Sequence, residues 1–198
     1  MTPGSKYDPA TFTGERQQAP DLSGIQMGHC ERYFFAANVV AGNVLDAGCG
    51  CGYGSKIMHD TGAVVTGIDL EKDAIEYAMH NYPGPEYIVA DVTKYRAPYN
   101  WVVSFENLEH LPDPIPALKN YRASRHLIIS TPNEIHYPFS RWRGDGDRFP
   151  HVRHYTPAQL DDLLASCGWA VRSRHCQVSK MGPVVEGVDG IFLIYVCD

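Results

Sequence analysis

Residues 44–55 read VLDAGCGCGYGS, with a glycine at every second position from Gly48 to Gly54. Glycine loses more backbone entropy on ordering than any other residue, so this spacing predicts a loop rather than a strand or a helix. The apolar run Asn43–Ala47 before the loop is typical of a strand, and residues 55–59 after it are typical of a helix. Because ligands of open α/β sheets lie beyond the carboxyl ends of the strands, the sequence predicts a nucleotide-type site here.

The glycine spacing and two acids restrict the ligand of this loop. A dinucleotide fingerprint would require glycine at position 53, where the chain has Tyr53. Asp46, at the end of the first strand, would repel a diphosphate and attract a cation. Asp69 ends the next predicted strand, 19 residues after Gly50, where a carboxylate can accept hydrogen bonds from both ribose hydroxyls. We therefore expect an adenosine without phosphates.

These features, together with Asp91 and the segment VSFENLEH at residues 103–110, resemble the class I S-adenosylmethionine-dependent methyltransferases. The likeness is greatest to the subgroup that includes the ubiquinone-biosynthesis O-methyltransferases, and it covers roughly residues 26–169. The sequence departs from the family pattern at residues 122–125, where RASR replaces the usual Pro-Gly-Gly turn. This changes a turn and not the site.

The resemblance implies a fold, a cofactor and a set of binding residues. The fold is α/β, a Rossmann-like three-layer sandwich whose seven-stranded sheet is mostly parallel with an antiparallel last strand. The cofactor is S-adenosylmethionine, and Asp91 would accept a hydrogen bond from the adenine N6 amine. The residues expected to bind the cofactor are Asp46, Gly48, Cys49, Gly50, Tyr53, Asp69, Leu70, Asp91, Val92 and Phe105.

Composition restricts the class of protein and of partner. The 198 residues, 44% hydrophobic and 20% charged, fit one globular domain. The net charge of −6 disfavours a polyanionic partner such as nucleic acid. The six cysteines show no CxxC spacing, which favours reduced thiols, and no apolar run approaches the ~18 residues of a membrane span. We expect a cytoplasmic protein.

The rest of the chain alternates predicted strands and helices. Residues 1–22 lack periodicity and predict a flexible arm, followed by one domain over residues 23–198. Ser23 and Gln26 have the spacing of a capping box for a helix that ends at Gly42, and Thr156 and Gln159 have the same spacing for a later helix. Further helices are expected at 73–81 and 113–121, with Met79 on the apolar face of the first, and further strands at 63–68, 87–90, 101–105, 126–130, 169–178 and 191–197.

One segment is too long for a simple link between a strand and a helix. Residues 133–153 follow the fifth strand and interleave basic and aromatic side chains. We interpret them as a substrate lid at the edge where the methyl acceptor must enter, with a passive loop as the alternative. The side chains that favour the lid are Arg141, Trp142, Arg143, Arg148, Phe149 and His151.

Catalytic candidates follow the fourth strand. A helical turn over residues 105–110 would place Glu106, Glu109 and His110 on one face. Two carboxylates and an imidazole there form either a divalent-metal site or an acid–base pair with a structural acid. His110 is the best single catalytic candidate, joined by Glu109 and by His151, with His154 next. The metal is the less favoured alternative, because magnesium prefers oxygen ligands.

We predict O-methylation of a small-molecule or sugar hydroxyl. Three other functions remain open. A nicotinamide oxidoreductase is disfavoured by the glycine register, and a catalytically silent S-adenosylmethionine-binding module requires that no group acts on an acceptor. An RNA 2′-O-methyltransferase is the third, because the Glu-x-x-Glu-His pattern and a later histidine resemble enzymes that methylate the 3′ end of small RNAs; the acidity of the chain disfavours it.

Overall fold

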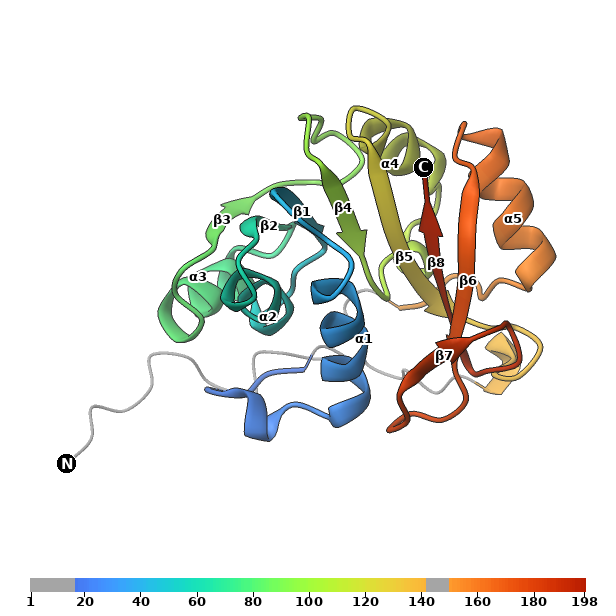
Figure 1. Ribbon diagram of the computed structural model, residues 1–198, viewed down its shortest axis with the longest axis horizontal. Coiled ribbons are helices and arrows are strands. Elements are labelled where there is room, and N and C mark those ends of the chain that lie inside the picture. Colours follow the sequence, from blue (N-terminus) through green and yellow to red (C-terminus); the bar gives the residue numbers. More distant parts are fainter. Residues whose placement is uncertain (1–16, 142–149) are drawn as a thin grey trace.

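The computed structural model describes residues 17–141 and 150–198, which form an eight-stranded sheet in the order β3-β2-β1-β4-β5-β8-β6-β7 (Figure 1). The five strands from β3 to β5 in this order run parallel, and β8 is antiparallel to both β5 and β6. The strands are β1 (Asn43–Ala47), β2 (Val64–Asp69), β3 (Glu86–Val89), β4 (Trp101–Ser104), β5 (His126–Pro132), β6 (Val171–Gln177), β7 (Val184–Glu186) and β8 (Phe192–Cys197).

The predicted fold class is confirmed, including the antiparallel last strand, but the sheet has eight strands where seven were expected. The additional strand is β7, which lies between the last two predicted strands and pairs with β6. Its three residues are too few to give a strand period in the sequence.

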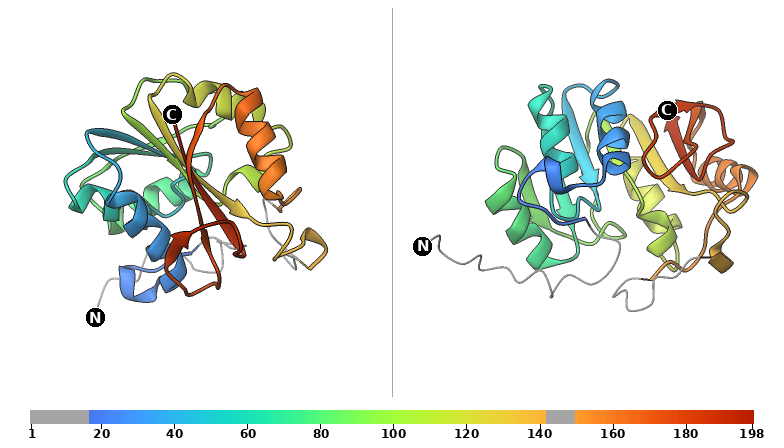
Figure 2. Two further views of the ribbon diagram at one scale, coloured as in Figure 1. Left: turned by 45° about the vertical axis from the view of Figure 1, so that its right-hand side comes forward. Right: turned by 90° about the horizontal axis from the view of Figure 1, so that it is seen from below.

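Helices cover both faces of the sheet, as the two views of Figure 2 show. Side chains of one strand alternate between the faces: Ile128 packs in the cluster that contains residues of α1 and α2, whereas Leu127 and Ile129 pack in the cluster that contains residues of α4 and α5. The three-layer sandwich therefore follows from period-two strands between amphipathic helices. The helices are α1 (Met27–Ala37), α2 (Tyr53–Asp60), α3 (Lys72–Asn81), α4 (Ile115–Tyr121) and α5 (Pro157–Ser166).

The start of α1 differs from the prediction. The capping box at Ser23 is wrong, because Asp21 accepts hydrogen bonds from both the backbone N–H and the hydroxyl of Ser23 and caps a 3-10 turn at Leu22–Gly24. The helix begins only at Met27. Within residues 17–22, predicted as part of a flexible arm, Ala19 is buried and its carbonyl accepts from the Tyr82 hydroxyl at 2.7 Å, whereas residues 20–22 are exposed. The residues before position 17 lie outside the described part of the chain.

Two further expectations concern individual helices. The capping box of α5 is confirmed, with reciprocal hydrogen bonds between Thr156 and Gln159. Met79 was expected on the buried face of α3 but is half exposed, and Tyr77 is buried instead. The buried face of α3 is therefore rotated about the helix axis, toward Tyr77 and away from Met79, relative to the face that the sequence pattern indicated.

The parallel strands bring four connecting segments to one edge of the sheet. The glycine loop follows β1, Asp69 ends β2, a 3-10 turn at Leu108–His110 follows β4, and the segment beginning at Asn133 follows β5. This edge is where the predicted site residues gather.

Candidate active site

The glycine loop closes tightly after β1. Gly48, Gly50 and Gly52 have φ values of 83°, 54° and 88°, which L-residues with side chains rarely adopt. The N–H groups of Gly48 and Cys49 both donate to the carbonyl of Ile68 at 2.9 Å, so the loop is fastened to the end of β2. A Cβ on Gly48 would lie 3.0 Å from the side chain of Asn107. The loop therefore requires glycine for both backbone angle and space.

Asp69 is the carboxylate that this loop meets. Its Oδ2 accepts from the Gly50 N–H and its Oδ1 from the Glu71 N–H, each at 2.9 Å. These two hydrogen bonds fix the carboxylate at the edge of the sheet, directly beside the glycine loop. The predicted contact of Asp69 with the two ribose hydroxyls stays a prediction.

Asp46 lies fully buried in β1 beside the loop. The Ser55 hydroxyl donates to its Oδ2 at 2.6 Å, and the Tyr33 hydroxyl donates to its Oδ1 at 3.2 Å. Burial outweighs these two hydrogen bonds and raises the pKa of Asp46 to about 7. A cation next to this carboxylate would favour its ionised form, which fits a ligand that carries an ammonium or sulfonium group.

The raised pKa gives a testable pH dependence of stability. Folded Asp46 keeps its proton at pH values where the unfolded chain has lost it, so the free energy of unfolding falls as pH rises from the ordinary value of 3.8 through about 7. Asp46→Asn cannot ionise and lacks this loss. We expect wild-type stability relative to Asp46→Asn to fall by about 2 kcal/mol between about pH 5 and about pH 8, measured by urea unfolding without ligand. An identical difference at both pH values would contradict the buried, proton-binding carboxyl.

Of the other residues predicted to bind the cofactor, two make aromatic or hydroxyl contacts, two are buried in the core and one is exposed. Tyr53 begins α2 and its hydroxyl lies 3.2 Å from Nδ1 of His29, while Phe105 packs edge-on against Tyr33 with ring centroids 5.0 Å apart. Cys49 and Val92 are buried in core clusters, and Leu70 is exposed after Asp69.

Asp91 remains an acceptor after β3. Its Oδ1 accepts from the Thr93 hydroxyl at 2.6 Å, and its Oδ2 lies 3.0 Å from Nζ of Lys94. The Thr93 hydrogen bonds, with help from Lys94, hold the pKa of Asp91 below its ordinary value. The carboxylate is therefore anionic at neutral pH, in keeping with the predicted role as an acceptor.

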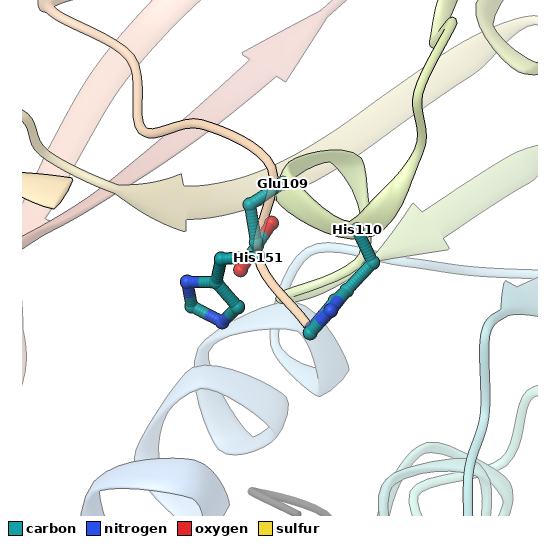
Figure 3. Close-up of side chains that lie close together, drawn as sticks. All are labelled: Glu109, His110 and His151. Carbon is teal, nitrogen blue, oxygen red and sulfur yellow. The ribbon is translucent and has the colours of Figure 1, made fainter. Parts of the chain in front are cut away.

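A second group of side chains gathers after β4. Glu109, His110 and His151 each offer one polar atom, and these atoms lie within 4.8 Å of one another. Figure 3 shows the Glu109 carboxylate between the two imidazole rings. A backbone hydrogen bond brings the three side chains together. The Val152 N–H donates to the Glu109 carbonyl at 2.7 Å and holds the segment that contains His151 against the 3-10 turn. Glu109 and His151 are buried, and His110 is half-buried.

The prediction that Glu106 shares this face is wrong. The 3-10 turn begins only at Leu108, so Glu106 lies before it. The backbone of Glu106 has a φ of 47°, which is not a helical angle. Its Oε1 accepts from the Ser130 hydroxyl at 2.7 Å, and its own N–H donates to Ser130 Oγ at 3.1 Å. Glu106 is therefore fastened to β5, and the cluster has one carboxylate and two imidazoles.

Several contacts at the site were not predicted. Ser55 was expected only as the start of a helix, although a hydroxyl nine residues after Asp46 in a strand–turn–helix unit is a usable signal. Asn107 donates to Ser104 Oγ at 3.1 Å and covers Gly48, which the sequence does not indicate. Arg32 on α1 is buried and donates to Gln177 Oε1.

Taken together, the described residues form an α/β domain with a positive-φ glycine loop and two buried aspartates at one edge of the sheet. A family model described as a methyltransferase domain matches residues 28–174. The chain belongs to the S-adenosylmethionine-dependent methyltransferase family, whose methyl donor is S-adenosylmethionine. The positive-φ glycines, the Asp69 carboxylate at the end of β2 and the buried Asp46 fit this donor.

Relatives and solved structures agree with the family. A Mycobacterium tuberculosis protein named a probable S-adenosylmethionine-dependent methyltransferase is 31% identical over 80% of this chain and 61% of its own length. A ubiquinone biosynthesis O-methyltransferase of Vibrio campbellii is 34% identical over 50% of this chain and 47% of its own length. The chain thus spans about six-tenths or less of the length of these relatives.

Among solved structures, magnesium protoporphyrin IX methyltransferase of Synechocystis with bound S-adenosylmethionine is 18% identical, with a TM-score of 0.59 over 86% of this chain and 76% of that chain. A methyltransferase of Streptomyces caelestis is 15% identical, with a TM-score of 0.67 over 86% and 88%. These likenesses support the fold alone. Within the part of the chain that the structure describes, no helix is both long and apolar enough to cross a membrane.

Proposed function

We propose that the chain transfers a methyl group from S-adenosylmethionine to a hydroxyl oxygen of a small molecule or sugar. The observation that carries this proposal is the group of Glu109, His110 and His151, whose first two members follow β4 at the same sheet edge as the glycine loop. A hydroxyl acceptor needs a group that takes its proton, and an imidazole next to a carboxylate can do so. The similarity to proteins named ubiquinone biosynthesis O-methyltransferases supports the choice of oxygen.

The reaction needs alignment rather than a covalent nucleophile. When bound, S-adenosylmethionine supplies a methyl group on a positively charged sulfur, which keeps the electron pair of the broken bond. Asp69 holds the ribose hydroxyls with its carboxylate, and Asp46 faces the cationic end. His110 accepts the proton of the attacking hydroxyl, while Glu109 next to it stabilises the resulting imidazolium.

We further propose the domain limits predicted from the sequence: an arm over residues 1–22, one domain over residues 23–198 and a substrate lid over residues 133–153. At the described start of the lid, Asn133 donates to the carbonyls of Val188 and Gly190 at 3.0 and 2.8 Å, which anchors it to the loop before β8. Arg141 closes a 3-10 turn, and His151 returns to the cluster. Trp142, Arg143, Arg148 and Phe149 lie outside the described residues.

Hydroxyl specificity can be tested with a panel of acceptors. We expect the protein to release S-adenosylhomocysteine with a catechol or a sugar and not with the corresponding O-methylated compound, an aromatic amine or a short RNA with a free 3′ end. The measurement is S-adenosylhomocysteine formation by mass spectrometry, with product structure by NMR. Turnover with the amine alone would contradict O-methylation, and turnover with RNA alone would favour the 2′-O-methyltransferase alternative. If the protein binds S-adenosylmethionine but turns over no acceptor, the catalytically silent binding module would be the favoured alternative.

A further inference from the structure

Two histidines of the segment before α5 form a directed chain of hydrogen bonds. His151 Nδ1 lies 2.8 Å from His154 Nε2, and His154 Nδ1 lies 2.6 Å from the backbone carbonyl oxygen of Tyr137. Both imidazoles are buried. Because the distances are those of good hydrogen bonds, the proton positions on the two rings are coupled.

The backbone carbonyl of Tyr137 determines which atoms donate in these two hydrogen bonds. A carbonyl oxygen can only accept, so Nδ1 of His154 carries the proton. In a neutral imidazole the other nitrogen is then an acceptor, and Nε2 of His154 accepts from His151. His151 must donate through Nδ1, which leaves the lone pair of the neutral ring on Nε2.

The second ring nitrogen of His151, Nε2, faces the cluster with Glu109 and His110. Nδ1 is engaged with His154, so Nε2 is the atom that His151 contributes next to Glu109 and His110 (Figure 3). The His110 and His151 rings meet edge to face with centroids 4.6 Å apart. With a neutral His154, the proton on Nδ1 of His151 is held from the side of the ring that faces away from Glu109 and His110.

Resting on the function proposed above, we infer that His154 is a positioning residue that locks His151 in the tautomer with an unprotonated Nε2. An unprotonated nitrogen at this place can accept a proton from the methyl acceptor or bind a cation, and a protonated one can do neither. The Tyr137 carbonyl and His154 thus fix the chemistry of the cluster from outside it.

One charged group faces His154 from the described residues around it. Glu134 Oε2 lies 3.9 Å from Nδ1 of His154 and also accepts from the Phe139 N–H at 2.8 Å. Its negative charge favours a proton on Nδ1, which is the arrangement that the Tyr137 carbonyl requires. A doubly protonated His154 would reverse the bond to His151 and place the proton of His151 on Nε2.

Nitrogen NMR tests the tautomer directly. In protein labelled with 15N-histidine, long-range correlations distinguish protonated from unprotonated ring nitrogens, and the signals lost in His151→Gln assign that ring. We expect a protonated Nδ1 and an unprotonated Nε2 for His151 in the wild-type protein. A protonated Nε2 would overturn the inference, and this result does not depend on an acceptor.

Kinetics test the role of His154 in turnover. His154→Ala removes the hydrogen-bond acceptor and should lower kcat by about tenfold or more, with the KM for S-adenosylmethionine unchanged. His154→Gln supplies an amide oxygen that can accept from His151 and should recover part of the loss, while His80→Ala, an exposed histidine of α3, should match the wild type. Equal kcat in His154→Ala and wild type would overturn the positioning role. A wild type without turnover would instead contradict the proposed function, and the NMR result would still decide the tautomer.

Discussion

Asp69→Ala is expected to weaken binding of S-adenosylhomocysteine by tenfold or more. Asp69 is buried at the end of β2, where its carboxylate accepts the backbone N–H groups of Gly50 and Glu71. In the proposed function this carboxylate also accepts hydrogen bonds from the ribose hydroxyls. A hydrogen bond to a charged group contributes about 1.5–3 kcal/mol, and about 1.4 kcal/mol corresponds to a factor of ten in affinity. Isothermal titration calorimetry on the purified variant measures the effect.

The control for this substitution must separate binding from folding. Asp69 also holds the Gly50 N–H, so its loss can loosen the glycine loop. Asp73→Ala removes an exposed aspartate from the first turn of α3 and should leave both affinity and thermal stability near those of the wild type. If folded Asp69→Ala binds S-adenosylhomocysteine as tightly as Asp73→Ala does, Asp69 does not anchor the ribose.

The sequence predicts the sheet well because its strands carry strong local signals. β1, β4 and β5 are buried apolar runs bounded by turns, and their predicted limits agree with the structure to within about two residues. β7 was missed because three residues cannot show a period, and its pairing depends on β6 across a loop. The failed capping box at Ser23 has a similar cause, since Asp21 competes for the same donors.

Residues of the candidate site were predictable where they are fixed by their position on a strand. Asp46 and Asp69 follow from their places in β1 and β2, because parallel strands end at one edge. Glu106 was misplaced because a positive φ after β4 is a tertiary effect, stabilised by Ser130 on the neighbouring strand. The role of His154 requires the Tyr137 carbonyl, and a contact 17 residues away along the chain leaves no periodic signal.

Turnover is expected to survive a metal chelator and to disappear in His110→Ala. One carboxylate and two imidazoles form the cluster, and with Glu106 turned to β5 this set offers too few oxygen ligands to suit magnesium. As a general base, His110 should contribute about 10²–10⁴-fold to the rate, and activity should rise with pH as the imidazole loses its proton. Steady-state kinetics after dialysis against EDTA, over a pH series, measure both effects.

A metal would give the opposite pattern, because a bound divalent cation would both hold Glu109 and His151 together and acidify a bound hydroxyl. Chelator would then abolish methyl transfer, and manganese or zinc, which accept imidazole ligands, would restore it better than magnesium.

Glu109→Gln separates the two cases further. With a metal, this variant should fail to respond to added cation; with a general base, it should retain chelator-insensitive turnover at a reduced rate, because the amide no longer stabilises the imidazolium of His110. The fixed lone pair of His151 serves either chemistry, so chelator-insensitive turnover by the wild type is the result that decides for the base.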